Sequence, residues 1–117
     1  MMNPVTTPRT VALVSDDLMF ASQLQAAMTR SGGRCDLVAG EAVPPADAVF
    51  VDLNSRVDQR IDLIARLRAQ RPELPISGFC HHAERDLRRR ALAAGATRVV
   101  NNGALQAVAL RVDGRIP

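Results

Sequence analysis

The chain has 117 residues, 47% of them hydrophobic, which is enough for one domain with a single packed core. Its 15 basic residues are all arginine, and the 12 acidic residues leave a net charge of +3, too small and too scattered to predict nucleic-acid binding. Three Phe and no Tyr or Trp argue against a stacking platform for single-stranded nucleic acid. Because its apolar runs are short and its first residues lack an apolar signal region, we expect neither membrane insertion nor export.

The first nine residues are rich in Pro and Thr, so we expect a flexible tail at 1–9 and a single domain over 10–117. Two cysteines, Cys35 and Cys80, lie far apart and form no Cys-x-x-Cys pair. Without an export signal they are expected to be buried or half-buried thiols in a reducing compartment, which predicts a cytoplasmic protein.

Short apolar runs alternate with amphipathic stretches along the chain. The apolar runs predict five strands, at residues 11–15, 35–39, 48–51, 76–80 and 97–100. These strands are continuously apolar rather than alternating, which indicates a parallel sheet covered by helices on both faces. The sequence therefore predicts an α/β fold with a doubly wound sheet of five parallel strands.

The amphipathic stretches predict four helices, whose inward residues recur at helical spacing. These residues are Phe20, Leu24, Ala27 and Met28; Ile61, Leu63, Ile64 and Leu67; Leu87, Ala91 and Ala94; and Leu105, Val108, Ala109 and Val112. The third of these helices starts at about Glu84 and ends at Gly95. We interpret its outer arginines, Arg85, Arg88 and Arg89, as a solvated face, with a docking surface for an acidic partner as the alternative.

The link between the second and third strands, GEAVPPA at residues 40–46, is short for a parallel crossover. Such a crossover takes about a dozen residues or more and usually contains a helix. Pro44 and Pro45 favour an extended path instead. We therefore expect the second helix of the fold to be missing or reduced to a turn.

Polar residues stand at the carboxyl end of nearly every expected strand. In chain order they are Asp16 and Asp17, then Asp52 and Asn54, then Cys80, His81 and His82, then Asn101 and Asn102. The carboxyl ends of parallel strands share one edge of the sheet, where binding sites form. We therefore expect the three aspartates to form an acidic pocket.

Carboxylates held together repel one another, and the usual remedies are protonation or a hard divalent cation such as Mg²⁺. An aspartate beside such an ion can act as a nucleophile toward phosphorus. A purely structural role for Asp16 and Asp17 at the start of a helix is the alternative, although it explains Asp52 poorly.

Other chemistry is disfavoured by the motifs that the sequence lacks. Cys80, His81 and His82 suggest a zinc site, but no Pro-Cys-x-x-Cys segment follows, so polar loop residues are the favoured interpretation. The chain has no nucleophile elbow, no glycine-rich dinucleotide loop and no P-loop. We do not expect an enzyme.

Four segments in order resemble the receiver domain of two-component response regulators. "LVSDD" is similar to the first strand and acidic pair of that family, and "VFVDLN" to its phosphoacceptor strand. "DLIARLRAQRPELPI" is similar to its third helix and the lead into strand four, and "ALAAGATRVV" to its turn into strand five. The resemblance covers residues 10 to about 110. It implies a flavodoxin-like fold with strand order 2-1-3-4-5. It also implies Asp52 as the phosphoacceptor, and as Mg²⁺ ligands Asp16, Asp17, Asp52 and the backbone carbonyl of Asn54.

Several positions depart from the family's pattern, and two of these bear on switching. The family has Thr or Ser at the end of strand four, where this chain has Cys80, and Lys at the end of strand five, where it has Asn102 and no Lys anywhere. A thiol is a weak donor and an amide is no cation. We therefore predict an atypical, pseudo-receiver domain that binds Mg²⁺ weakly at best. Its output would be contact with a protein partner, a histidine kinase or a downstream signalling protein, with little or no phospho-switch.

Two alternatives stay open at the level of the sequence. One is a conventional single-domain response regulator, phosphorylated on Asp52 by a histidine kinase with Mg²⁺. The other is a flavodoxin-like module that binds a small anion or nucleotide, against which the missing glycine-rich phosphate loop weighs. The sequence leaves the oligomeric state open, a dimer included.

Overall fold

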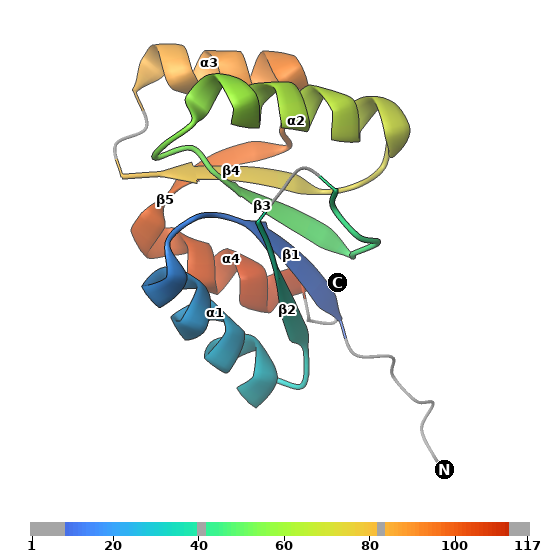
Figure 1. The fold of residues 1–117 in the computed structure, drawn as a ribbon, viewed down its shortest axis with the longest axis vertical. Helices are drawn as coiled ribbons and strands as arrows, with labels where there is room; N and C mark the ends of the chain where they lie inside the picture. The colour runs from blue at the N-terminus through green and yellow to red at the C-terminus, as the bar shows by residue number, and fades with distance from the viewer. Residues whose placement is uncertain (1–8, 40–41, 82–83, 113–117) are drawn as a thin grey trace.

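The computed structural model describes residues 9–39, 42–81 and 84–112, so most of the expected tail at 1–9 lies outside the described residues. Strands and helices alternate along the chain (Figure 1). Their bounds are β1 (Thr10–Val14), α1 (Leu18–Arg30), β2 (Arg34–Val38), β3 (Ala48–Asp52), α2 (Val57–Gln70), β4 (Ile76–Cys80), α3 (Arg85–Ala94), β5 (Arg98–Asn101) and α4 (Leu105–Val112), which a short 3-10 helix (Asn102–Ala104) precedes. None of these helices has the length and apolarity needed to cross a membrane.

The five strands form one parallel sheet in the order β2-β1-β3-β4-β5, which confirms the predicted fold and strand order. In the register, Val14 lies beside Val38 and Val51. Asp52 lies beside Phe79 on β4. The carboxyl ends of the strands therefore meet along one edge, as the positions of the polar residues predicted.

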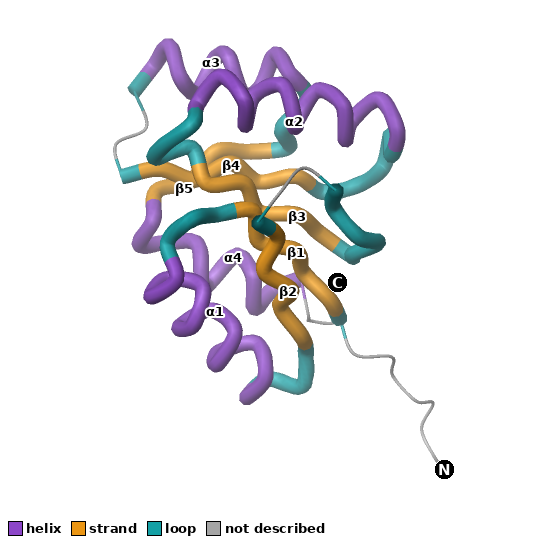
Figure 2. Tube along the Cα trace, in the orientation of Figure 1, coloured by secondary structure: helices purple, strands orange, loops and turns teal. Residues whose placement is uncertain are grey.

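Helices cover both faces of the sheet, with α1 and α4 on one side and α2 and α3 on the other (Figures 1 and 2). Successive residues of β1 alternate between the two layers: Val11 and Leu13 pack with α1 and α4, while Ala12 and Val14 pack with α2 and α3. Every residue of β3 and β4 is buried, because these central strands have helices on both sides. That burial is the physical reason for their continuous apolar sequence.

The link between β2 and β3 has no helix in its described part, residues 42–46, as predicted. Val43 is buried there and packs with the core on the α2 side of the sheet. Arg71 holds the link in place from the end of α2, donating from Nη2 to the carbonyl oxygen of Val43 at 2.7 Å and from Nη1 to that of Pro44 at 3.2 Å. Over residues 42–46 the link is therefore anchored by hydrogen bonds and one apolar side chain instead of by a helix.

The outer strand β2 is polar on the face where the missing helix would have packed. Val38 belongs to the core on that face, and by strand alternation Arg34 and Asp36 point to the same side. These two side chains form an ion pair, with Arg34 Nε 3.1 Å from Asp36 Oδ1. The charged pair is consistent with a missing helix on this face, because a helix there would cut the two charges off from solvent.

The predicted faces of the helices are confirmed with one refinement. In α3, Ala91 is fully buried and Leu87 packs half-buried against the core, while Arg85, Arg88 and Arg89 are exposed. In α2 the predicted Leu63, Ile64 and Leu67 are buried. Ile61 is only half-buried, and the buried position in the first turn is taken by Arg60. The side chain of Val112 lies outside the described residues.

Gly78 in the middle of β4 is explained by a close approach of Leu53. A Cβ atom at Gly78 would lie 2.7 Å from Leu53 Cδ1, and Leu53 is itself buried.

Gly78→Ala is therefore expected to lower the free energy of unfolding by about 1–3 kcal/mol through overpacking. Urea denaturation followed by circular dichroism measures this. At Gly103 the nearest atom would be 3.5 Å away, so Gly103→Ala should change stability by less than about 0.5 kcal/mol. Equal effects of the two substitutions would contradict the explanation.

Candidate functional site

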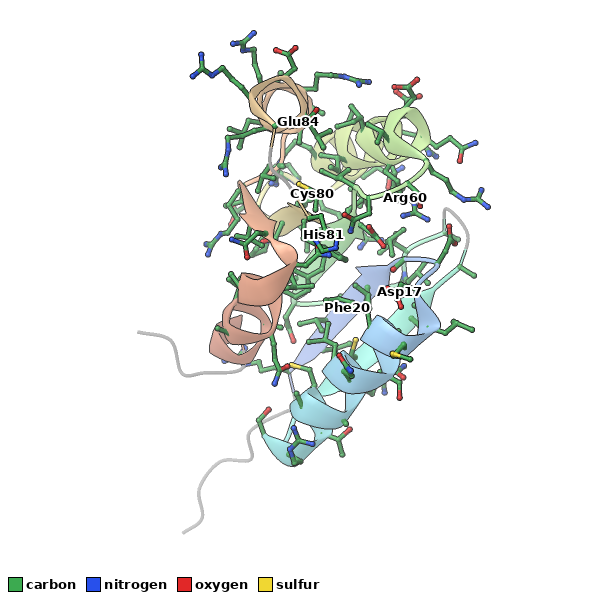
Figure 3. All side chains as sticks on the ribbon, turned by 90° about the vertical axis from the view of Figure 1, so that its left-hand side faces the viewer. Asp17, Phe20, Arg60, Cys80, His81 and Glu84 are labelled. Atoms are coloured by element: carbon green, nitrogen blue, oxygen red, sulfur yellow. The ribbon has the colours of Figure 1, made fainter. Side chains whose placement is uncertain are left out.

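A hollow of about 320 Å³ lies at the carboxyl edge of the sheet. Its lining residues are Asp16, Asp17, Asp52, Asn54, Ser55, His81 and Asn102. The structure thus brings together all three predicted aspartates, Asn54 and Asn102. Cys80 is buried at the end of β4 and is not among the lining residues. Figure 3 looks toward this edge, with Asp17 at the start of α1, Arg60 on α2, and Cys80 and His81 at the end of β4.

Asp52 is buried, and both of its carboxylate oxygens accept hydrogen bonds. Oδ2 accepts from Ser15 Oγ at 2.6 Å, and Oδ1 accepts from both the backbone N and the Nδ2 of Asn54 at 2.8 Å. Charge-assisted bonds of this kind offset the cost of burying a carboxylate. Ser15 was missed as a site residue, although a buried hydroxyl directly after an apolar strand and before two acids is a signal that could have identified it.

Asp16 is paired with two arginines from the start of α2. Its Oδ2 accepts from Arg56 Nε at 2.9 Å and from Arg60 Nη2 at 3.3 Å. Arg60 also donates from Nη1 to the backbone carbonyl oxygen of Asp52 at 2.8 Å. The sequence predicted a cluster of mutually repelling acids, and the structure shows that cations partly neutralise it.

Arg60 was also missed from the sequence, and a signal for it exists. Together with Leu63, Ile64 and Leu67 it occupies positions i, i+3, i+4 and i+7, so it continues the apolar stripe of α2. A charged residue on a core-facing stripe needs a buried partner. That requirement points to an acid or a carbonyl group beyond the end of the helix.

Asp17 has the structural role that was considered as an alternative. It is the N-cap of α1, in extended conformation, and its Oδ1 accepts from the backbone N of Phe20 at 2.9 Å. An N-cap bond of this kind satisfies one of the free N–H groups at the start of the helix. Asp17 also lines the hollow, so the cap and the acidic lining are provided by the same side chain.

The side chain of Asn54 connects the ends of three neighbouring strands. Its Nδ2 donates to Asp52 Oδ1 at 2.8 Å and to Asn102 Oδ1 at 3.3 Å, and its Oδ1 accepts from the backbone N of His81 at 2.7 Å. The resemblance implied a role only for its backbone carbonyl. The structure therefore adds a cross-link between the segments that follow β3, β4 and β5.

Both cysteines are buried thiols without a disulfide, as expected. Burial raises the pKa of the Cys35 thiol to about 11, and the charge of Asp36 acts in the same direction. Burial also raises the pKa of Cys80, although Arg88 acts against that shift. Neither thiol is therefore an activated nucleophile at neutral pH.

Slow modification of both thiols in the folded protein is the expected consequence. At pH 8 a thiol whose pKa is about 11 is ionised roughly a hundredfold less than one with the ordinary value of 9.0. A colorimetric thiol reagent should therefore detect little reaction within minutes in the native state and two thiols per chain in denaturant. Reactivity should rise as the pH is raised toward the pKa. Rapid native labelling at pH 7 would contradict the burial of these side chains.

The comparisons with known proteins show the fold. A response regulator from Thermotoga maritima matches 91% of this chain and 98% of its own, with a TM-score of 0.75 at 18% identity. The fold is that of response-regulator receiver domains. The receiver-fold chemotaxis response regulator CheY4 of Vibrio cholerae matches with a TM-score of 0.74 at 18% identity, over 91% of this chain and 99% of its own. A comparison with protein-family models finds no match, and neither does one with curated proteins.

One receiver-fold structure comes from a response regulator of Burkholderia pseudomallei, described with a phosphorylated aspartic acid, a calcium ion and citrate. It matches with a TM-score of 0.77 at 19% identity, over 92% of this chain and 67% of its own. In the present chain several of the oxygens that a cation would need already accept hydrogen bonds: both of Asp52, one of Asp16 and one of Asp17. Among the described residues, no group of three His, Cys, Asp or Glu is placed to hold a metal. As arranged, these residues do not fit a divalent ion.

Proposed function

We propose that this chain is a receiver-like signalling domain that acts by protein–protein contact and is at most weakly switched by phosphorylation of Asp52. It has no catalytic activity of its own on other molecules, works in the cytoplasm and binds Mg²⁺ weakly at best. The receiver fold and the position of Asp52 in the hollow support the signalling class. The main support for a weak switch is that Asn102, an amide and not a cation, lines the β5 side of the hollow.

The charge balance around a phosphorylated Asp52 supports this proposal. A phosphoryl group adds negative charge and strong acceptor oxygens next to Asp16 and Asp17. Of the described residues that line the hollow, none is Lys or Arg, and Asn102 on the β5 side offers an amide. The arginines at its edge, Arg56 and Arg60, are already paired with Asp16. An amide donates a hydrogen bond but does not neutralise the added charge. Little energy is therefore available to favour a second conformation.

The hydrogen bonds of the unphosphorylated state also resist a switch. A phosphoryl group on either oxygen of Asp52 takes the place of a bond to Ser15 or to Asn54. Asn54 in turn holds Asn102 and the backbone of His81. Cys80 is buried and is a poor donor, so it offers no strong bond to draw β4 toward a phosphoryl group. The geometry favours the resting arrangement.

Nuclear magnetic resonance with a phosphoryl analogue tests this proposal. The protein is treated with beryllofluoride and Mg²⁺, and the amide shifts of residues 80–105 are compared with those of Asp52→Asn under the same conditions. We expect at most small changes, confined to the neighbours of Asp52. Large, saturable shifts over β4 and β5 that vanish in Asp52→Asn would instead identify a conventional phospho-switched response regulator.

The exposed arginines of α3 are proposed as a contact surface for an acidic partner. Arg85, Arg88 and Arg89 face solvent on one short helix, and part of their charge is balanced by Asp86, which lies 3.6 Å from Arg89. A complex formed through this surface should weaken as salt rises, because exposed charges are screened. Titration with an acidic peptide at 50 and 300 mM salt measures this. Binding that ignores salt, or that survives Arg85→Gln with Arg89→Gln, would reject this surface.

A further inference from the structure

We infer that Arg60, together with Arg56, is a built-in cation at the edge of the acidic hollow, paired with its Asp16, that takes the electrostatic role of a divalent metal and keeps the metal out. The observation behind this inference is an almost fully buried arginine side chain at the carboxyl end of β3. The side chain of Arg60 is 7% exposed, and it reaches both an acid of the hollow and the backbone of the strand that carries Asp52.

Arg60 is fixed in this position by helix α2. It lies in the first turn of the helix on the same stripe as Leu63, Ile64 and Leu67, so its aliphatic stem packs where an apolar side chain would stand. The guanidinium then extends past the start of the helix. There it donates to the carbonyl oxygen of Asp52 at 2.8 Å and to Asp16 Oδ2 at 3.3 Å. The rest of the fold therefore positions the charge before any ligand arrives.

Arg56 adds a second donor to the same oxygen of Asp16. It adopts a left-handed backbone conformation, with φ at 52°, at the N-cap position of α2, and its Nε lies 2.9 Å from Asp16 Oδ2. A non-glycine residue in this region carries a conformational cost, which the pairing with Asp16 helps to offset. Unlike Arg60, its side chain is more than half exposed.

These two arginines make the hollow unsuitable for Mg²⁺ on grounds of charge and of geometry. Each guanidinium carries a positive charge and offers only donors, with no acceptor for a cation. A dication next to it is repelled, and at Oδ2 of Asp16 it must compete with two N–H groups. Mg²⁺ requires near-octahedral oxygen ligands and gives up its water reluctantly, so it competes poorly for such an oxygen.

Removing the arginines should therefore create a metal site. In the double variant Arg56→Gln with Arg60→Met, the thioether chain keeps the apolar volume of the stem while both charges are lost. We expect the wild-type chain to show no saturable Mn²⁺ binding up to roughly 10 mM, and the variant to bind at least about tenfold more tightly. Loss of the free Mn²⁺ signal in electron paramagnetic resonance reports binding, and competition by Mg²⁺ shows that the site takes that ion.

Two controls make the test specific. Adding Asp16→Asn to the double variant should abolish the gain, because Asp16 is the carboxylate released by the substitutions. Arg90→Gln removes an arginine from an exposed ion pair with Asp58, at 2.6 Å, and should leave Mn²⁺ binding unchanged. Saturable, Asp16-dependent binding to the wild-type chain below roughly 10 mM Mn²⁺ would overturn the inference, and so would a folded double variant without any gain.

The single variant Arg56→Gln keeps the inference testable if the double variant does not fold. Its side chain is exposed, so the fold should tolerate the change. It removes one of the two charges and should give a gain of about threefold or more. A folded Arg56→Gln without a gain then counts against the inference. The experiment uses no phosphoryl donor and no partner, so its failure is distinguishable from a failure of the proposed signalling function.

Discussion

Replacing Phe79 by alanine is expected to lower the free energy of unfolding by about 3–5 kcal/mol. Phe79 is 1% exposed on the central strand β4, and its ring stacks on that of Phe20 in α1, with the ring centroids 5.2 Å apart and the planes at 27°. The substitution removes a large apolar surface and leaves a cavity between the sheet and α1. Because a domain of this size is stable by only about 5–15 kcal/mol, much of the margin would be lost.

Urea denaturation followed by far-ultraviolet circular dichroism measures this effect, since the chain has neither Trp nor Tyr to serve as a fluorescent probe. Phe20→Ala is the matched control. Phe20 is only half-buried, so its removal should cost clearly less. The double variant should reveal a coupling of about 0.5–1.5 kcal/mol from the stacked pair. If Phe79→Ala fails to fold, Phe79→Leu, with a smaller expected loss, replaces it. Equal losses for Phe79 and Phe20 would contradict the packing described above.

Asp16→Ala is expected to lower the free energy of unfolding by about 1–3 kcal/mol, although Asp16 itself is about half exposed. The reason lies in its partner. Arg60 is buried and loses its only carboxylate among the described ion pairs, so an uncompensated charge remains beside the core. Relief of repulsion with Asp17 and Asp52 reduces the loss, and for that reason the estimate stays below the usual cost of breaking a fully buried pair.

Asp58→Ala is the matched control for Asp16→Ala. Asp58 pairs with Arg90 at 2.6 Å, which is a shorter distance than that between Asp16 and Arg60. In this pair, however, Asp58 is largely exposed and Arg90 about half exposed. Exposed pairs contribute about 0–1 kcal/mol, so its removal should have a small effect. Urea denaturation at low and at high salt separates the two cases, because screening reduces the exposed pair more than the pair with the buried Arg60. A loss for Asp58→Ala as large as that for Asp16→Ala would show that the burial of Arg60 is not the cause.

Side chains of the same domain partly compensate the charges of the acidic site. Arg60 and Arg56 compensate Asp16, hydrogen bonds from Ser15 and Asn54 satisfy Asp52, and Asp17 caps a helix. Under the proposed function, a partner would recognise the resting surface of this fold without phosphorylation. The stability measurements and the metal-binding measurements therefore address the same feature by separate routes.

The sequence by itself determined the α/β class, the positions of all five strands to within one residue, and the absence of a helix in the described part of the link between β2 and β3. These features depend on local patterns. Continuous apolar runs such as 76–80 identify buried strands, and the spacing of Leu63, Ile64 and Leu67 identifies a helix face, whatever the rest of the chain does. The shared edge of the strand ends follows from parallel topology alone, so the gathering of Asp16, Asp17 and Asp52 could also be predicted.

Only the tertiary structure decided what each of these acids contacts. The pairing of Arg60 with Asp16 joins residues far apart in the sequence. It depends on how α2 is positioned relative to the carboxyl end of β1. The cross-link made by Asn54 likewise depends on the spacing between the ends of three strands. A hydrogen bond forms only within a narrow range of donor–acceptor distances. Whether such a contact forms therefore depends on where whole helices and strands lie relative to one another, to within about an ångström. Periodicity specifies which face of an element is buried, but it contains no information on that placement.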